Sequence, residues 1–374
     1  MPNSYASGSD YYCIIMNALL VRRTVPTKNI GDYIQSLAQL QFWGETDCFV
    51  DCEQINTVSE RVNLIMNGWW MWHPENFPPS EFVNPLFISF HINGAFGKRL
   101  LNEKAIDYLK KYEPIGARDL DTVELLETAG IKAYYSGCLT LTLDLSFKTD
   151  ESNNRIVFVD PEYSYPRGRN FIGWIRSFAI TILYIKSANK LYNSFCVDKQ
   201  TAFSRISMSL NKLMCAALFY HDYSPYFEDS VLFTADYVSH IVDSQKVYTT
   251  HESCLLYARK LLELYARAKL VVTSRVHAAL PCISFDTPVI FVDAEPIDFG
   301  SKKGRLGGTF ELFNYTMKIQ KRRLFPYSNE LKTLLENQKI SYNSVLSPSQ
   351  RHLSLRDNLI SSVKAFVKKC RESD

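Results

Sequence analysis

The sequence predicts an α/β protein made of two Rossmann-like domains that face a central cleft, with a C-terminal helix packing back. Short apolar runs with strand character alternate with stretches of helical periodicity, which is typical of parallel sheets covered by helices on both faces. A polar, strand-poor segment at 144–154 interrupts this alternation, which then resumes. The length of 374 residues suits two domains. We therefore expect domains at 1–146 and 155–374.

The first half is expected to contain strands and helices in regular succession. The predicted strands are 12–20, 48–51, 62–71, 86–91 and 131–135, and the predicted helices are 32–42, 98–112 and 121–129. The last of these helices has the clearest boundaries. Asp121 can cap its start, Glu124 can complete a capping box, and Gly130 can end it.

The second half repeats the pattern. The predicted strands are 156–159, 231–235, 270–273 and 288–293, and the predicted helices are 171–193, 199–220, 255–266 and 353–368. The last helix is amphipathic, with Leu355, Leu359 and Val363 on one face. Two such sheets predict ligand sites beyond the carboxyl ends of their strands.

Composition excludes several classes of protein. A net charge of +3 is too small to indicate nucleic-acid binding. Nine irregularly spaced cysteines favour reduced thiols in a cytoplasmic protein, and no second pair or histidine accompanies Cys48 and Cys52 to predict a metal site. We expect no signal peptide. The longest apolar stretch, 171–184, is interrupted by Arg176 and too short to span a bilayer, so it predicts a buried helix or one at a membrane surface.

Three basic clusters are expected to be solvated faces, an anion pocket or a dock for an anionic membrane. They lie at 302–305, 321–323 and 368–369. The first belongs to a glycine- and lysine-rich loop, in which Lys302 and Arg305 could close on an anion.

The strongest motif is the turn between the expected strand 270–273 and an apolar helix. It contains Ser274, Arg275 and His277. Backbone N–H groups at a helix start hold anions, the arginine fork suits phosphate or carboxylate, and histidine titrates near neutral pH. The motif indicates an anion pocket with a proton carrier. A capped helix with a surface arginine and a core histidine is the alternative, and Pro281 weighs against a regular helix.

A second loop-to-helix segment contains Asn29, Gly31 and Asp32. Asp32 and Gln35 have capping-box spacing, so this segment can simply begin a helix. The functional interpretation is that Gly31 lets the backbone approach a ligand. Asp32 then offers its carboxylate to substrate hydroxyls or acts as a general base.

Three further candidates have plain structural alternatives. His91 ends an expected strand and could bind substrate, although a single histidine there is more often structural. Arg118 could meet an anion or pair with Asp119, and His251 could reach the cleft. Motifs for nucleotide hydride chemistry, P-loops, zinc proteases and serine hydrolases are absent from the sequence.

Several segments, in order, resemble the polysaccharide pyruvyltransferase family. They are Asn29–Ala38, Ile115–Asp119 with Thr122, Ser136–Thr142, and Thr273–Leu280 followed by Thr287–Phe291. The stretch 155–246 carries no matching motif. The resemblance implies a fold like that of metal-independent, inverting GT-B glycosyltransferases, with an N-terminal acceptor-side domain and a C-terminal domain that binds phosphoenolpyruvate. It also implies a sugar acceptor with two free hydroxyls, a cyclic pyruvate ketal as product, and no cofactor beyond the co-substrate.

The resemblance also implies roles for the candidate residues. His277 is expected to protonate the enol or the leaving phosphate, and Asp32 or His91 to accept hydroxyl protons. Arg275 and the helix start hold one anionic group of the donor, and Arg118 or the basic loop holds the other. The remaining substrate-binding candidates are Ser274, Asn29, Gly31, His251, Lys302 and Arg305.

We expect the acceptor to be a hexose in a capsular polysaccharide intermediate linked to undecaprenyl diphosphate. The protein would then be cytoplasmic, at the inner face of the cytoplasmic membrane, with the basic clusters and the 171–184 helix as its dock. Two alternatives stay open. One is a GT-B glycosyltransferase with a nucleotide-sugar donor, and the other is a non-catalytic scaffold of a polysaccharide assembly complex.

Overall fold

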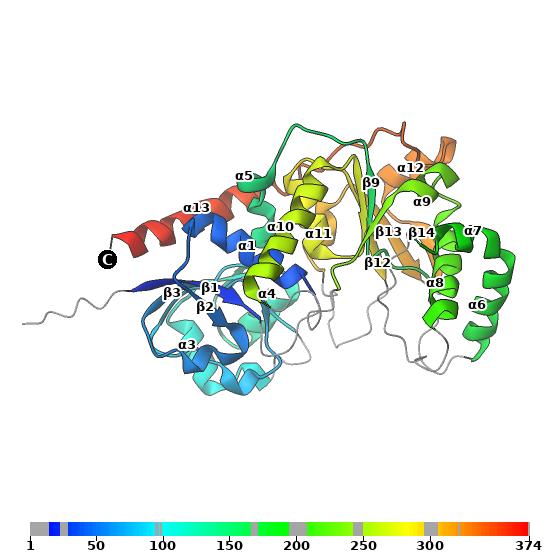
Figure 1. Cartoon of the computed structure of the whole chain (residues 1–374). Helices are drawn as coiled ribbons and strands as arrows, with labels where there is room; N and C mark the ends of the chain where they lie inside the picture. Colours follow the sequence, from blue (N-terminus) through cyan, green and yellow to red (C-terminus); the bar gives the residue numbers. More distant parts are fainter. Residues whose placement is uncertain are drawn as a thin grey trace, which may run out of the picture.

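A computed structural model describes most of the chain and confirms the predicted α/β class (Figure 1). The described residues are 15–22, 29–93, 97, 99–165, 171–193, 208–241, 250–294, 306–320 and 322–372. The predicted loop residues Lys302 and Arg305 lie outside them.

The first half contains two parallel sheets. One has the order β2-β1-β3-β5, and the other has the order β4-β6-β7-β8. Their strands are β1 (Met16–Val21), β2 (Cys48–Asp51), β3 (Val62–Ile65), β4 (Gly68–Trp70), β5 (Val83–Leu86), β6 (Phe90–Ile92), β7 (Ile115–Ala117) and β8 (Ala133–Tyr135). The helical segments are α1 (Gly31–Trp43), η1 (Cys52–Thr57), η2 (Pro74–Asn76), α3 (Glu103–Lys110), α4 (Leu120–Thr128), η3 (Leu139–Thr142) and α5 (Asp144–Phe147).

Two predicted strands of this half are broken. The stretch 62–71 forms β3 and then β4, and the run predicted at 86–91 is divided between β5 and β6. Ser89 has a φ of 53°, a left-handed conformation that interrupts the pleat. Backbone bonds from Met66 N to Leu86 O (2.8 Å) and from Gly68 N to Ser89 O (3.1 Å) continue the pairing across the breaks. The first sheet is therefore connected to the second by backbone hydrogen bonds between the two segments where the strands break.

The second half has one sheet, of order β10-β9-β11-β12-β13-β14, in which only β14 runs antiparallel to its neighbour. Its strands are β9 (Ile156–Val159), β10 (Asp236–Val238), β11 (Leu270–Thr273), β12 (Val289–Ala294), β13 (Tyr315–Gln320) and β14 (Arg323–Pro326). The helical segments are α6 (Phe171–Leu183), α7 (Ile185–Leu191), α8 (Met208–Tyr223), α9 (Asp229–Thr234), α10 (His251–Arg267), α11 (Val276–Ser284), η4 (Phe310–Leu312), α12 (Asn329–Asn337) and α13 (Leu353–Arg371).

Three predictions for helices and strands are corrected. The expected strand 231–235 is mostly helix α9, and the strand begins at Asp236, because a short, mostly apolar run does not distinguish helix from strand. Helix α4 is capped by Asp119, whose carboxylate accepts from Thr122 N at 3.0 Å, and not by Asp121. Asp32 lies inside the first turn of α1 and does not cap it, since Ile30 occupies the cap position.

The largest apolar cluster joins the two halves. It includes Ile34 and Leu37 of α1, Leu262 of α10 and Ala279 of α11. Helix α13 returns from the end of the chain and contributes Val363 to the same cluster, beside α1 (Figure 1). The start of α1 is consequently held against elements of the second half.

Helices α6 and α7 replace the single predicted helix 171–193. They bend by 82° at their junction. Among the described helices, none by itself has the length and apolar character needed to cross a membrane, although this bent pair meets both criteria when taken together.

Candidate active site

The two halves share a topological feature that determines where ligands bind. In the orders β2-β1-β3 and β10-β9-β11, the chain reverses its direction across the sheet beside its first strand. Loops diverge at such a point and leave a crevice at the carboxyl ends of the strands. The crevices are therefore expected beyond β1 and β3 in the first half, and beyond β9 and β11 in the second.

The turn after β11 forms the edge of the second crevice. Thr273 Oγ1 donates to Val159 O at 2.8 Å and accepts from Arg275 N at 2.9 Å. Ser274 Oγ accepts from Glu162 N at 2.8 Å. These bonds tie the end of β11 to the end of β9, so the backbone of the predicted motif is held rigidly.

Arg275 lies at the start of α11 with its guanidinium group beside Asp160. Its Nε donates to Asp160 Oδ2 at 2.8 Å, and 36% of the arginine side chain is exposed. Helix α11 has no side-chain cap. The arginine fork and the first backbone N–H groups of α11 therefore lie together at one partly open position, which suits an anion.

Asp160 organises the second crevice. It accepts from Ser239 Oγ at 2.6 Å and from His240 N at 2.9 Å, in addition to Arg275. Burial opposes its ionisation, but the Arg275 charge and these hydrogen bonds leave its pKa below the usual range. Burial lowers the pKa of His240 to about 4, so this histidine is neutral at pH 7, and its Nε2 lies 2.9 Å from the Tyr265 hydroxyl.

The start of α1 meets this crevice directly. Ile30 N donates to His240 O at 2.8 Å, and Gly31 N donates to Asn29 Oδ1 at 3.1 Å. A Cβ atom at Gly31 would lie 2.9 Å from His277 Nδ1, closer than real Cβ contacts allow. The fold therefore brings together two motifs that are more than 240 positions apart in the sequence, and any side chain at position 31 would have to displace His277.

His251 forms a second connection between the halves. It is the first residue of α10, and its Nδ1 lies 2.9 Å from the Tyr33 hydroxyl of α1. Its ring centroid is 4.7 Å from that of Phe49. These contacts place His251 against the first half, beside Tyr33 of α1 and Phe49 of β2.

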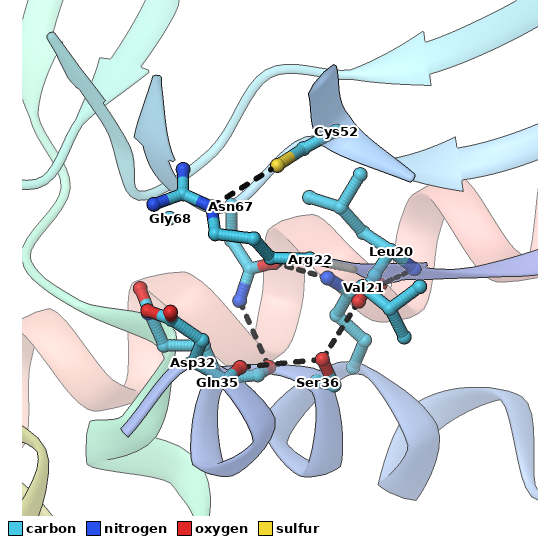
Figure 2. A pocket seen from close by; sticks show the side chains of 10 residues that line it. Leu20, Val21, Arg22, Asp32, Gln35, Ser36, Cys52, Asn67 and Gly68 are labelled. Atoms are coloured by element: carbon cyan, nitrogen blue, oxygen red, sulfur yellow. Dashed lines mark hydrogen bonds between the residues drawn. The ribbon is translucent and has the colours of Figure 1, made fainter. Parts of the chain in front are cut away.

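A polar pocket occupies the first crevice (Figure 2). Its lining comprises Leu20, Val21, Arg22, Asp32, Gln35, Ser36, Gln39, Cys52, Asn67 and Gly68. Arg22 Nε donates to Cys52 Sγ at 3.4 Å, and its Nη2 lies 3.5 Å from the buried Glu53 carboxylate. Asn67 donates to Gln35 O at 3.2 Å and accepts from Gln39.

Sequence reasoning identified Asp32 but missed Arg22 and Asn67, two other polar residues that line this pocket. Arg22 and Asn67 each follow a strand, β1 and β3, at the ligand edge of the sheet. Their position after an apolar run was the available signal. Asp32 lines the same pocket from α1, so the first crevice and the His277 contact share one helix start.

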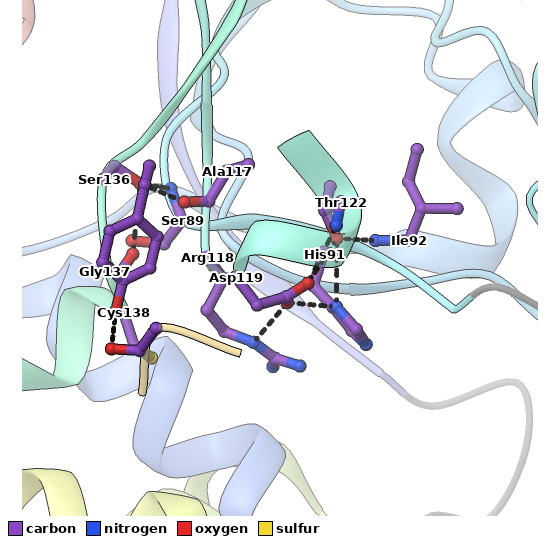
Figure 3. A network of polar contacts seen from close by, with 12 residues as sticks. Ser89, His91, Ile92, Ala117, Arg118, Asp119, Thr122, Ser136, Gly137 and Cys138 are labelled. Carbon is purple, nitrogen blue, oxygen red and sulfur yellow. Dashed lines mark hydrogen bonds and ion pairs between the residues drawn. The ribbon is translucent and has the colours of Figure 1, made fainter. Parts of the chain in front are cut away.

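His91, Arg118 and Asp119 form a separate, closed group at the ends of β6 and β7 (Figure 3). His91 Nδ1 is 2.5 Å from Asp119 Oδ2, and Arg118 Nε is 3.7 Å from the same atom. Thr122 donates its hydroxyl to Asp119 Oδ1 at 2.9 Å. Burial opposes the ionisation of Asp119, but the His91 and Arg118 charges lower its pKa to about 2.

Beyond the basic loop, the chain contacts the first half near this group. Gly307 O accepts from Leu120 N at 3.1 Å, and Gly308 O accepts from the Tyr135 hydroxyl at 2.7 Å. Gly308 has a φ of 83°, and a Cβ there would lie 2.8 Å from the Tyr135 ring. Within the described ranges, no group of three histidine, cysteine or acidic side chains is arranged to hold a metal ion.

Comparison with known proteins identifies the family. The family model described as polysaccharide pyruvyl transferase matches residues 29–296. The match begins at the start of α1 and extends past α11, so it includes both segments that meet at Gly31 and His277. No match is found among curated proteins. The chain belongs to the polysaccharide pyruvyl transferase family.

Proposed function

We propose that the protein transfers the pyruvyl group of phosphoenolpyruvate to two hydroxyls of a sugar, forming a cyclic ketal and releasing phosphate. The observation that carries this proposal is the convergence of Arg275, His277 and the α1 start at one crevice. Phosphoenolpyruvate has a phosphate and a carboxylate, so it needs cationic or N–H-rich partners. Arg275 and the uncapped start of α11 are such partners.

The reaction needs a proton donor and a proton acceptor. A proton is added to the terminal carbon of the enol, and one sugar hydroxyl bonds to the central carbon and loses its proton. Phosphate then leaves with its bonding electrons, and the second hydroxyl completes the ketal as its proton departs. We assign the donor role to His277 and the acceptor role to Asp32, because these side chains flank the same helix start.

We assign the reacting hydroxyls of the acceptor sugar to the first crevice, whose pocket of about 30 Å³ leaves the rest of the sugar outside it. Arg22, Gln35 and Asn67 offer donors and acceptors suited to hydroxyl groups, and Asp32 belongs to the same lining. We propose a hexose of a polysaccharide intermediate carried on undecaprenyl diphosphate. Asn29 and Ser274 accept backbone N–H bonds at the start of α1 and after β11, and His251 supports α1 through Tyr33.

His91 and Arg118 receive a positioning role in this proposal. Their side chains are 4% and 12% exposed and are already engaged with Asp119. Contact with a substrate would require opening this group. Lys302 and Arg305 are proposed to contact the second anionic group of the donor. This proposal is supported by Gly307 and Gly308, which follow them in the sequence and accept hydrogen bonds from residues of the first half.

We further propose a two-domain arrangement of the GT-B kind, with the boundary between residues 146 and 155, in a cytoplasmic protein. The separate sheets of the two halves support the division. The seven described cysteines are free thiols, as befits a reducing compartment.

The test uses purified protein, phosphoenolpyruvate and a lipid-linked oligosaccharide. We expect phosphate release that depends on the acceptor, and a product heavier by one pyruvyl ketal. Substitutions His277→Ala and Arg275→Ala should abolish both signals. Addition of a whole sugar from a nucleotide-sugar donor would instead establish a glycosyltransferase. A scaffold would show no turnover and no rise in melting temperature with phosphoenolpyruvate.

A further inference from the structure

Helix α6 has the reverse of the polarity expected for a surface helix. Its large apolar side chains face solvent, with exposed fractions between 41% and 78%: Phe171, Ile172, Ile175, Phe178, Ile182 and Leu183. Its buried positions include the small or polar residues Gly173, Ser177 and Thr181. A helix that only completed a soluble fold would bury the first set and expose the second.

The buried face of α6 has satisfied hydrogen bonds and close packing, so the exposure of its apolar side chains does not reflect poor packing. Ser177 Oγ donates to Gly173 O at 2.9 Å, and Thr181 Oγ1 donates to Ser177 O at 2.7 Å. These bonds satisfy both hydroxyls inside the helix and let it pack closely on α8. Trp174 is buried on the same side, where its ring meets that of Tyr165 at 5.6 Å.

The sequence around this helix is strongly basic. Residues 163–213 contain one acidic residue, Asp198, and eight basic ones: Arg167, Arg169, Arg176, Lys186, Lys190, Lys199, Arg205 and Lys212. The whole chain carries a net charge of only +3, so the remainder is net negative. Among the described residues of this stretch, Arg176 and Lys186 are exposed on the apolar helices α6 and α7 themselves.

We propose that α6 is an interfacial helix that docks the protein on the surface of an anionic lipid bilayer. Its exposed isoleucine and phenylalanine side chains enter the boundary between headgroups and acyl chains, while Arg176 and Lys186 contact anionic headgroups. The 82° bend between α6 and α7, together with the packing of α6 on α8, fits a helix that lies on the surface and does not cross it.

A second copy of the chain is the competing occupant of this face. A two-fold dimer places the same patch on both sides of the interface, so Arg176 and Lys186 would face basic residues of the other copy. Anionic lipid complements the same charge. In Figure 1, α6 and α7 lie at the outer edge of the second half, away from the first half and α13.

The experiment is flotation of the full-length protein with vesicles of phosphatidylcholine containing phosphatidylglycerol, compared with phosphatidylcholine alone. We expect binding to the anionic vesicles, weaker binding at high salt, and at least tenfold less binding for Ile172→Gln/Ile182→Gln. The matched control is Leu256→Gln/Val345→Gln, which removes two other exposed apolar side chains, 55% and 84% exposed, and should bind normally. All substituted positions are solvent-exposed, and unchanged melting temperatures check the fold.

A second pair of variants tests the charges. Arg176→Gln/Lys186→Gln should weaken binding to anionic vesicles, whereas Lys104→Gln/Lys364→Gln on α3 and α13 should not. Failure of the wild type to float, or equal losses in the control variants, would overturn the proposal. A dimer in light scattering that the Ile172→Gln/Ile182→Gln variant dissociates, without vesicle binding, would assign the face to a second copy. Flotation needs no turnover, so its outcome is independent of the proposed reaction.

Discussion

Two groups of histidine, aspartate and arginine lie at carboxyl ends of strands, one in each half. In the first half, Asp119 lies between His91 and Arg118, and in the second, Asp160 lies between His240 and Arg275. The residue types and their place in the sheet are alike. The side chains of the first group are at most 12% exposed, whereas Arg275 is 36% exposed.

The difference lies in what the aspartate must neutralise. Asp119 bonds directly to the histidine ring, so charge is balanced inside a closed group. Asp160 receives the backbone N–H of His240, whose ring is kept neutral by burial, and its charge is directed at Arg275. The guanidinium group is thereby oriented while part of it stays accessible. The same three residue types therefore form a closed group in one half and a partly exposed one in the other, where we propose that the donor binds.

The largest expected effect tests whether Arg275 and Arg118 differ in function. Arg275→Lys keeps a positive charge beside Asp160 but removes the planar fork, so we expect kcat/KM to fall about 100- to 1000-fold, or roughly 3–4 kcal/mol. Arg118→Lys should cost less than about tenfold. Initial rates of phosphate release measure both, with melting curves as a check on folding. A larger loss for Arg118→Lys would reverse the comparison.

The closed group should matter more for stability. Asp119→Asn removes the charge that balances His91 and Arg118 in a buried position, so we expect the free energy of unfolding to fall by about 3 kcal/mol. Asp160→Asn should cost less, about 1–2 kcal/mol, because Arg275 stays in contact with water. Urea titrations of both variants provide the values. Equal losses would show that the second group is closed as well.

The two groups should also respond to different pH ranges. His240 has a folded pKa of about 4, whereas an ordinary solvent-exposed histidine has a pKa of 6.5, so between these values the unfolded chain binds more protons than the folded one. Its contribution, about 3 kcal/mol, is present above pH 6.5 and is lost as the pH falls towards 4. Asp119, with a pKa of about 2, loses its contribution only below about pH 4.

His240→Asn isolates the first of these two ranges. Burial also lowers the pKa of His352, so the wild type has a second contribution of the same sign. The difference in unfolding free energy between wild type and His240→Asn, measured by urea titration from pH 4 to 7, should therefore shrink as the pH falls. A difference that does not vary with pH would mean that His240 titrates normally in the folded protein.

A smaller effect than that of Arg275→Lys is expected at the contact between the two motifs. Gly31→Ala introduces a Cβ atom 2.9 Å from His277 Nδ1, so the histidine must shift. We expect kcat/KM to fall about tenfold with nearly unchanged stability. Gly44→Ala is the control, because Gly44 has a φ of 83° and no neighbour within 4 Å of the added atom. It should cost about 1 kcal/mol of stability and leave activity intact.

Local pattern determined much of the fold. The strands at 48–51, 156–159 and 270–273 have the predicted limits, and the α/β class follows from the alternation around them. Strand character there is set by short-range spacing of apolar residues, which the sequence displays directly. The run at 231–235 shows the limit of this signal, because a short, mostly apolar run fits either a helix or a strand.

The Ser274–His277 turn and the Asn29–Asp32 segment were recognisable in the sequence as residue types, each beside a strand or helix end. Only the tertiary structure decided that they meet, because the packing of α1 on α10 and α11 brings Gly31 to His277. The tertiary structure also buries His91 and Arg118 against Asp119, whereas Arg275 stays partly exposed. Local sequence sets the chemistry that a side chain offers, whereas burial and distant neighbours set whether a ligand can reach it.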